Sequence, residues 1–362
     1  MARAHAIGYR NVPMFFGEGP GFELYKLAEA NDSLASTAAE KLSFARWAYD
    51  WREVTRDNEV TLVDVSTPTF LHKDPAIDAL EHGKSVLCEK PLASNVEDAR
   101  EMYEVARKKG GITMVGFNYR RVPLVTFSRE LIRSGKIGKV YQIAVHFLQD
   151  WATPNFPLTW RFDSKSAGAG ALAYLGSHAI DLVRFLVSEP AEVCAQMIAL
   201  IENRPIPNKK EATGKSDVDD STFALFRLEG GASAQITASW VATGRKMGLG
   251  FEVNGSEGSI CFDMERPNEL RYYSSSDSET EQGFKTIYAG PRHPYGKGFV
   301  FGVPSIGMGY LDSLTNQMHD LMVAVSNGEK LEPSFYDGWR VNQIIDAIKK
   351  SASSERWVKC VE

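Results

Sequence analysis

The sequence predicts an α/β protein with two domains, a parallel-sheet domain followed by an α+β domain with a large, mostly antiparallel sheet. The chain has 362 residues, more than one hydrophobic core usually organises. In its first third, strand-like and helix-like segments alternate strictly, which is typical of a parallel sheet covered by helices on both faces. In the remainder, strand-like segments follow one another across short turns. We place the boundary between residues 118 and 119.

The segments of the first domain can be assigned in chain order. We expect strands at 22–28, 60–65, 85–88 and 112–115, and helices at 32–42, 72–82 and 94–109. The last helix opens with a capping box, because Ser94 is followed three residues later by Glu97. Gly110 and Gly111 end the same helix.

The second domain has a different pattern. It starts with a long strand at 139–148, and a helix at 177–186 follows a Gly/Ala-rich loop. A run of strand-like segments covers 192–288, and two helices, at 313–326 and 338–351, close the domain. Gly230 with Gly231, and Asn254 with Gly255, are dipeptides typical of hairpin turns. These turns favour an antiparallel sheet.

Composition and charge are those of an ordinary globular protein, with 43% hydrophobic and 24% charged residues. The net charge of -5 argues against a nucleic-acid partner, which requires a concentrated basic face. No apolar segment approaches the ~20 residues of a membrane span, and no leader opens the chain, so we expect a cytoplasmic protein without a membrane partner. The scattered cysteines, without a CxxC pair, indicate buried thiols rather than disulfides or a metal site.

Two turns, at 66–68 and 89–91, lie where buried strands end. Ligands bind at the carboxyl ends of the strands in open parallel sheets. Lys90 therefore emerges from a buried strand into a ligand-binding edge. There its ammonium can donate to a reacting oxygen and stabilise a developing alkoxide. The alternative is a lysine at a strand end that is simply solvated.

Seven stretches that run nearly from end to end resemble the Gfo/Idh/MocA family of nicotinamide-dependent sugar and polyol oxidoreductases. They lie at 66–72, 88–93, 116–123, 148–151, 160–162, 168–186 and 337–341. Glu-Lys-Pro alone is only three letters, but its combination with a Gly-rich segment that ends in His178 is specific. The pieces PMFF, AEAN, NYRR, LQDW and HPYG resemble the levoglucosan dehydrogenase-like branch.

The resemblance implies a Rossmann-type domain at 1–118 that binds NAD, and a domain at 119–362 for substrate binding and oligomerisation. It implies hydride transfer between nicotinamide and a CH–OH group of a sugar or cyclic polyol, levoglucosan-like or inositol-like. It also makes a homodimer or homotetramer the expected assembly. We expect no metal.

The usual opening of such a domain, a strand followed by G-x-G-x-x-G, is missing. Residues 1–6 look like the helix that follows this loop in relatives. The stretch 17–21 is not a substitute, because it precedes the second strand and Pro20 has no N–H to donate. We expect the numbering to start at an internal methionine of a longer gene product.

His178 is the expected general base, since a neutral imidazole can accept the hydroxyl proton. A lone histidine in a helix is otherwise structural. Relatives carry Asp four residues earlier, where this chain has Tyr174. Tyr174 either donates to the substrate oxygen or marks a site that is altered or impaired. Asp181 has a structural role or partly substitutes for the missing acid.

Glu29 ends the second strand, where a carboxylate can accept hydrogen bonds from ribose hydroxyls and repel a 2′-phosphate. This favours NAD over NADP, although a surface acid is the alternative. The other cofactor residues are implied by the resemblance: Ser66, Thr67, Pro68, His72, Glu89, Lys90, Asn118, Trp160 and Arg161.

Several polar and aromatic side chains suit a sugar, because aromatic faces pack on C–H surfaces while Gln and Arg bond hydroxyls. With Lys90, Tyr174 and His178, the substrate set comprises Tyr119, Arg121, Gln149, Trp151 and His293. Core packing is an equal alternative for Trp151. Two rival functions stay open: an NAD-dependent glycosidase on the same scaffold, and a non-catalytic sugar- or nucleotide-binding protein.

Overall fold

The computed structural model describes residues 1–17, 20–209, 211–299 and 307–361. The chain divides into two compact units, the first formed by residues 1–118 with 309–340 and the second by residues 119–308 with 341–362. The break after residue 118 falls at the predicted boundary. Residues 309–340 differ from the prediction, because they return to the first unit instead of staying with the second.

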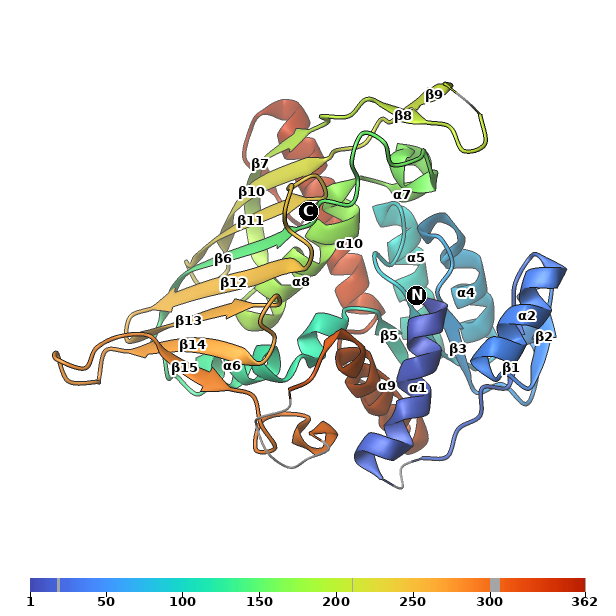
Figure 1. Cartoon of the computed structure of the whole chain (residues 1–362), viewed down its shortest axis with the longest axis horizontal. Coiled ribbons are helices and arrows are strands. Elements are labelled where there is room, and N and C mark those ends of the chain that lie inside the picture. The colour runs from blue at the N-terminus through green and yellow to red at the C-terminus, as the bar shows by residue number, and fades with distance from the viewer. Residues whose placement is uncertain (18–19, 210, 300–306, 362) are drawn as a thin grey trace. The chain divides into compact units, whose positions relative to one another are not determined.

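The first unit alternates helices and strands. Its elements are α1 (Ala2–Phe16), β1 (Lys26–Ala28), α2 (Asp32–Leu42), β2 (Arg46–Ala48), α3 (Arg52–Thr55), β3 (Leu62–Val65), α4 (Lys73–Glu81), β4 (Ser85–Cys88), α5 (Val96–Lys109), β5 (Thr113–Val115) and α9 (Tyr310–Asn327). Strands β3, β4 and β5 form one parallel sheet, and β1 pairs with β2 in a second one (Figure 1). The parallel sheet predicted for this region is confirmed.

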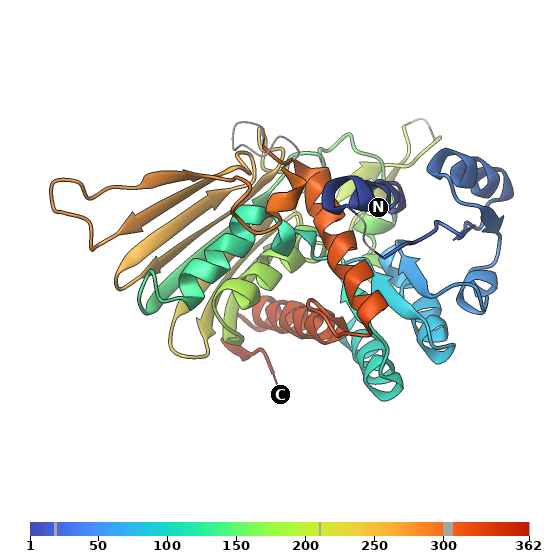
Figure 2. The same cartoon turned by 90° about the horizontal axis from the view of Figure 1, so that it is seen from below.

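Helices α1 and α9 pack on β4 and β5 through a buried cluster. It contains Tyr9, Val12, Leu87, Met114, Met318, Leu321 and Met322. Figure 2 shows α1 and α9 on one side of these strands and α5 on the other. A Cβ on Gly8 would lie 3.1 Å from the Met318 side chain, so the missing side chain allows α1 and α9 to approach closely. This packing explains why residues 309–340 join the first unit.

Three local predictions for the first unit differ from the structure. The strand expected at 22–28 is only Lys26–Ala28, because its partner β2 is equally short. The N-cap of α5 is Asn95 and not Ser94: the Asn95 side chain accepts the Asp98 N–H at 2.8 Å. No element was predicted for β2 and α3. Gly110, with φ 70°, ends α5 as predicted.

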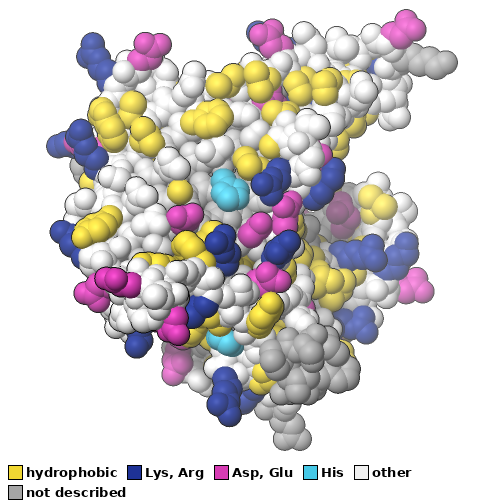
Figure 3. Space-filling view, turned by 60° about the vertical axis from the view of Figure 1, so that its left-hand side comes forward, with side chains coloured by type: hydrophobic (Ala, Val, Ile, Leu, Met, Phe, Trp, Pro, Cys, Tyr) yellow, Lys and Arg dark blue, Asp and Glu magenta, His cyan; other side chains and the backbone are white. Residues whose placement is uncertain are grey.

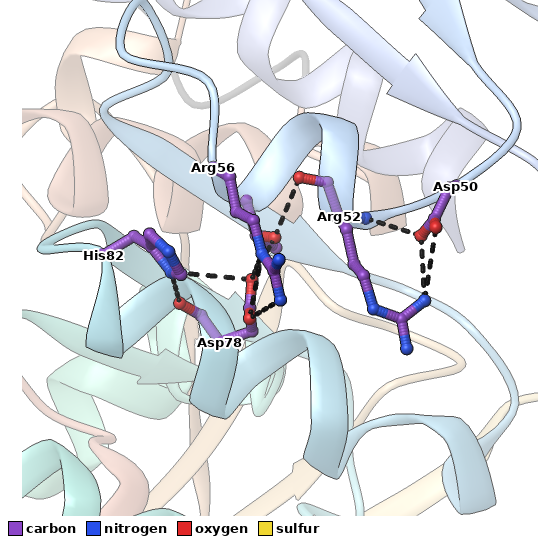
Figure 4. A network of polar contacts seen from close by, with 6 residues as sticks. Asp50, Arg52, Arg56, Asp78 and His82 are labelled. Atoms are coloured by element: carbon purple, nitrogen blue, oxygen red, sulfur yellow. Dashed lines mark hydrogen bonds and ion pairs between the residues drawn. The ribbon is translucent and has the colours of Figure 1, made fainter.

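A partly exposed polar network joins α3 to α4 (Figure 4). Asp78 of α4 accepts from the Arg56 guanidinium at 2.8 Å and from the Thr55 hydroxyl. His82 lies one turn further along the chain, 3.6 Å from the same carboxylate. Ion pairs of this exposure add little to stability, on the order of 0–1 kcal/mol each. The network therefore orients α3 more than it stabilises the unit.

The second unit is built on a nine-stranded sheet in the order β15-β14-β13-β12-β6-β11-β10-β7-β16. Only β6 and β11 pair in parallel, so the predicted mostly antiparallel sheet is confirmed. The strands are β6 (Val140–Leu148), β7 (Pro190–Ile198), β10 (Ser221–Leu228), β11 (Ser233–Ser239), β12 (Gly248–Gly255), β13 (Gly258–Asp263), β14 (Glu269–Ser274), β15 (Lys285–Tyr288) and β16 (Val358–Lys359). A separate pair consists of β8 (Asn203–Pro205) and β9 (Thr213–Lys215).

Helices α6 (Pro123–Arg133) and α8 (Ser177–Leu186) lie on one face of this sheet, as Figure 2 shows. The short helix α7 (Ser164–Ala167) precedes α8, and α10 (Phe335–Ser354) starts in the first unit and ends in the second. Of the two predicted hairpin turns, Gly230 and Gly231 form one, with φ of 85° and 90°. The other turn lies at Ser256 and Glu257, because Asn254 still pairs with Ser259 in the ladder.

The four cysteines form no disulfide in the described chain, and Cys88 and Cys360 are buried. Within the described ranges, no helix has both the length and the apolar character to cross a membrane. Nor do those ranges bring three or more His, Cys, Asp or Glu side chains together as metal ligands. Glu18 and Gly19, part of the rejected glycine-rich stretch, lie outside the described residues. Residues 2–6 belong to α1 and Met1 is its N-cap, in agreement with the helix that the resemblance implied for residues 1–6.

Candidate functional site

The carboxyl ends of β3, β4 and β5 meet at one edge of their sheet. Val65 pairs with Cys88, and Cys88 pairs with Val115. The segments that follow these residues therefore leave the sheet side by side, at the edge where an open parallel sheet binds its ligand. This edge carries six of the residues predicted for the cofactor: Ser66, Thr67, Pro68, Glu89, Lys90 and Asn118.

Lys90 stands two residues after the end of β4, and its side chain is partly exposed. Its backbone N–H donates to Oε2 of the buried Glu89 at 3.1 Å. The Lys90–Pro91 peptide bond is cis, an isomer that the sequence could not establish. The lysine is thus carried by a backbone segment that a buried carboxylate holds in place.

His72 joins two of the edge turns from inside the unit. Its Nε2 lies 2.9 Å from the Thr67 carbonyl oxygen, and its Nδ1 lies 3.2 Å from those of Pro91 and Leu92. The side chain is buried, and this burial lowers the pKa of His72 below its usual value. His72 therefore holds the turns at 66–68 and 89–91 together, and its contact with a cofactor stays a prediction.

Glu29 and Asn118 differ in exposure. Glu29 follows β1, is exposed, and accepts the Asn31 N–H through Oε1 at 3.4 Å. Its carboxylate is open to solvent at a strand end. Asn118 is buried, and its Nδ2 donates to the Ser313 hydroxyl of α9 at 2.9 Å. The α9 contact was not foreseen, because the helix is remote in sequence.

Sequence reasoning missed a largely buried charge cluster behind the edge. His5 of α1 lies between two carboxylates, with Nδ1 2.9 Å from Asp64 Oδ2 and Nε2 3.0 Å from Glu89 Oε1. Burial alone would lower the pKa of His5, but the two carboxylates outweigh it and raise this pKa to about 10. Burial would raise the pKa of Glu89, and the bond to His5 lowers it. The signal in the sequence that could have indicated this cluster was an acidic residue near the end of each of two strands, Asp64 in β3 and Glu89 after β4.

In the second unit, a π-helical turn, Leu172–Gly176, carries Tyr174 and runs directly into α8. The buried Asp219 holds the start of this turn, because its carboxylate accepts the Gly170 and Leu172 N–H groups at 2.7 and 2.8 Å. π-turns are frequent at functional sites. The wider turn also changes the spacing that a regular helix would give to Tyr174 and His178.

His178 is buried near the start of α8. Its ring packs edge-on against Tyr119 at 4.6 Å and lies 5.9 Å from the ring of Phe147. Tyr119 is also buried, and its hydroxyl lies 3.5 Å from the Met247 sulfur. Aromatic walls thus orient the imidazole of the expected base.

Tyr174 belongs to an aromatic cluster of the second unit. The Trp151 ring packs edge-on against Tyr174 at 5.5 Å and against Trp240 at 5.3 Å. Gln149 accepts the indole N–H of Trp151 at 2.9 Å. The Arg161 guanidinium lies over the rings of Trp160 and Tyr174, at 4.6 and 5.6 Å. Five predicted residues therefore gather here: Gln149, Trp151, Trp160, Arg161 and Tyr174.

The remaining predicted residues have other surroundings. Asp181 makes a buried two-pronged ion pair with Arg120, with distances of 2.6 and 2.9 Å, which favours its structural role. His293 accepts the Gly290 N–H at 3.1 Å and packs on Phe127. In the described chain, none of the contacts of His293 reaches the Trp151 cluster. Arg121 is buried.

The first unit offers groups that fit a dinucleotide. An exposed carboxylate at the end of β1 suits ribose hydroxyls, and the hydroxyls of Ser66 and Thr67 lie at the edge where the nicotinamide half would bind. Lys90 adds a cation at the same edge. The donor and acceptor set therefore agrees with the cofactor that the sequence pattern implied.

Two family profiles match the chain. The profile described as "Oxidoreductase family, NAD-binding Rossmann fold" matches residues 4–117, and the "GFO/IDH/MocA C-terminal domain" profile matches residues 126–261. Levoglucosan dehydrogenase of Pseudarthrobacter phenanthrenivorans is 40% identical over 371 residues, covering 99% of this chain and 95% of that protein. Glucose-6-phosphate 3-dehydrogenase of Bacillus subtilis is 26% identical, covering 81% of this chain and 79% of that protein.

A solved structure titled "Levoglucosan dehydrogenase, complex with NADH and levoglucosan" superposes with a TM-score of 0.96 at 40% identity. It covers all of this chain, and this chain covers 97% of it. Both the sequence and the fold thus agree over nearly the full length. The chain belongs to the Gfo/Idh/MocA family of oxidoreductases, whose N-terminal domain is an NAD-binding Rossmann fold.

Proposed function

We propose that this protein is an NAD-dependent dehydrogenase that acts on a secondary CH–OH group of a sugar or cyclic polyol, levoglucosan-like or inositol-like. The observation that carries the proposal is the placement of Lys90, at the ligand-binding edge of the sheet with its backbone bound by buried Glu89. A lysine that was merely solvated would need no such support.

The bound nicotinamide supplies the hydride chemistry, accepting the hydride of the carbon that is oxidised. Lys90 donates to the oxygen on that carbon and stabilises the negative charge that develops there. His178 accepts the hydroxyl proton as general base. Loss of one hydride and one proton leaves a ketone, so the product is a ketose or keto-sugar.

The cofactor is NAD, because the exposed carboxylate of Glu29 accepts from ribose hydroxyls and repels a 2′-phosphate. The residues at the strand edge bind the rest of the dinucleotide, supported by His72. We assign the following cofactor contacts: Glu29, Ser66, Thr67, Pro68, His72, Glu89, Lys90, Asn118, Trp160 and Arg161. Most of these contacts come from the first domain, 1–118, and Trp160 and Arg161 come from the second.

The second domain provides the sugar contacts. Its aromatic cluster offers the faces on which sugar C–H groups pack, and Gln149 and Arg121 bond hydroxyls. Tyr174 donates its hydroxyl to the substrate oxygen in place of the acid that relatives carry. The assigned substrate residues are Lys90, Tyr119, Arg121, Gln149, Trp151, Tyr174, His178 and His293. The contacts of His293 make it the weakest member of this set.

The same domain also supports a homo-oligomer. One face of the nine-stranded sheet has no helix on it in Figure 2, and β10 exposes Phe223 and Leu225 there, at 45% and 54%. Figure 3 shows hydrophobic side chains among charges of both signs on one side of the molecule. Burial of such side chains against a second copy favours a homodimer or homotetramer.

The first experiment measures NADH absorbance with NAD+ and a panel of sugars and polyols that includes levoglucosan and inositols. We expect NADH to form with at least one of them. Glycoside cleavage without net NADH would instead favour the NAD-dependent glycosidase. Sugar binding without any turnover would favour a non-catalytic binding protein.

The matched variants are Lys90→Met and Lys109→Met, two lysines of which the second is exposed at the end of α5. Lys90→Met should abolish turnover while the circular dichroism spectrum stays unchanged, because it removes the cation that stabilises the alkoxide. Lys109→Met should retain full turnover. Equal activity of Lys90→Met and the parent protein would disprove the mechanism.

A further inference from the structure

His5 has carboxylates on both sides of its ring. Nδ1 lies 2.9 and 3.0 Å from the two oxygens of Asp64, and Nε2 lies 3.0 Å from Oε1 of Glu89. A neutral imidazole carries a proton on one nitrogen only, so its second nitrogen would face a carboxylate with lone pair against lone pair. Only the imidazolium donates to both. Two carboxylates beside one ring therefore favour the imidazolium, on a side chain that is itself only 1% exposed.

Each carboxylate that His5 binds also holds a piece of the ligand-binding edge. Glu89 uses Oε1 for His5 and Oε2 for the Lys90 N–H at 3.1 Å. Asp64 accepts the Ser66 hydroxyl at 3.2 Å. His5 is therefore connected to Lys90 through Glu89 and to Ser66 through Asp64.

Gly116 closes the other side of the Glu89 carboxylate. A Cβ on Gly116 would lie 2.7 Å from Glu89 Oε1, closer than such atoms approach. The carboxylate thus fills the space beside β5 and cannot move there. Its orientation is determined by His5, the Lys90 N–H and the Gly116 backbone together.

The other ionisable groups near the cluster do not replace His5. Lys90 and His5 are the cations that lower the pKa of Glu89. Cys88 and Tyr9 are buried neutral groups, because burial next to these carboxylates raises both pKa values well above normal. His72 is kept neutral by its own burial. His5 is thus the buried cation that the described structure places between the two carboxylates.

We infer that His5 is a positioning residue, an imidazolium that orients Glu89 and Asp64 and through them fixes Lys90 and Ser66 for catalysis. The catalytic part of this inference rests on the proposed function of Lys90. The protonation of His5 and its effect on the Lys90 backbone can be measured without any enzymatic activity.

The test compares His5→Gln with Val12→Ala in the full-length protein. Glutamine removes the charge and can serve only one carboxylate well. Val12 lies on the same helix, is 1% exposed and packs in the apolar cluster with α9, so its truncation loosens α1 without touching either carboxylate. If His5 had only a structural role, the two variants should change Lys90 N–H exchange and kcat equally when they lower the free energy of unfolding by the same amount.

Two readouts need no substrate. In side-chain ¹⁵N NMR, we expect both nitrogens of His5 to stay protonated at neutral pH. In amide hydrogen exchange, we expect the Lys90 N–H to exchange about tenfold faster in His5→Gln, since a hydrogen bond to a charged group is weakened by roughly 1.5 kcal/mol. Val12→Ala should leave this local rate unchanged.

The kinetic readout uses the sugar that gives the highest NADH rate in the panel. We expect His5→Gln to lower kcat about tenfold to a hundredfold and to change KM for the sugar much less, because a misplaced Lys90 affects the reacting oxygen. A singly protonated His5 would overturn the inference, as would equal Lys90 exchange in the two variants. If no sugar is oxidised, the proposed function fails, and the two substrate-free readouts still decide the role of His5.

Discussion

The carboxylate of Glu89 accepts the backbone N–H of Lys90 at 3.1 Å, so the buried residue before the lysine holds the lysine's backbone. This bond depends on the space that Gly116 leaves, because a Cβ there would lie 2.7 Å from Glu89 Oε1. We predict that Gly116→Ala displaces the carboxylate and lowers kcat about tenfold. Steady-state kinetics with NAD+ measure this effect.

The control for this variant is Gly21→Ala, in the same unit. A Cβ on Gly21 meets nothing within 4 Å, so the substitution should leave kcat unchanged. An unchanged kcat in Gly116→Ala would show that the position of Glu89 does not matter to turnover.

Stability should fall on mild acidification because of His72. Burial lowers its pKa in the folded protein below 6.5, so the unfolded chain binds more protons in this range. The stabilisation is therefore present above about pH 6.5 and is lost as the pH falls below it. Thermal unfolding between about pH 5 and 6.5 measures the slope, because above pH 6.5 the raised pKa of His5 changes stability in the opposite direction. His72→Gln should flatten it, and an unaltered slope would assign the acid sensitivity elsewhere, for example to half-buried His146.

A buried ion pair in the second unit should be far more sensitive to truncation than an exposed one. Arg204 and Asp220 are both fully buried, 3.0 Å apart, and Asp220 also accepts the Trp240 indole N–H at 2.7 Å. Asp220→Ala leaves a buried guanidinium without its counter-charge, so we predict a loss of about 3–5 kcal/mol in the free energy of unfolding. Urea denaturation measures this difference.

The comparison variant is Glu192→Ala, which removes the partner of Arg227 on the surface, where the arginine is 64% exposed. Its cost should not exceed about 1 kcal/mol. Similar costs for the two variants would mean that Arg204 finds water or another acceptor once Asp220 is gone.

Substitution of Tyr174 tests whether its hydroxyl donates to the substrate oxygen or whether the residue marks an altered or impaired site. If its hydroxyl donates to the substrate, Tyr174→Phe should lower kcat/KM about tenfold or more, since an unmade hydrogen bond to a reacting group costs roughly 1–3 kcal/mol. The ring packing against Trp151 would be retained. The measurement is kcat/KM with the best sugar of the panel. Retention of full activity in the variant would leave Tyr174 with a packing role only.

Much of the fold follows from local sequence patterns. Helix α2 and strand β4 have their predicted bounds, and so does helix α8. The strict alternation also predicted a shared carboxyl edge, which the ladder from Val65 through Cys88 to Val115 provides. These features are predictable because helix propensity, turn residues and hydrophobic periodicity act between residues that are near neighbours in the chain. The family assignment, made from short motifs, is confirmed by both profiles.

Other features were decided by the tertiary structure. His5 bonds Asp64 and Glu89 across 59 and 84 residues, and residues 309–340 return to the first unit to bury Met318 and Leu321. The π-turn that carries Tyr174 depends on Asp219, which is 45 residues further along the chain than Tyr174. Burial and hydrogen-bond partners of this kind are set by segments that meet only when the chain closes. The sequence alone therefore determined most of the elements and the place of Lys90 at a strand end, and the folded structure decided which buried charges hold its backbone.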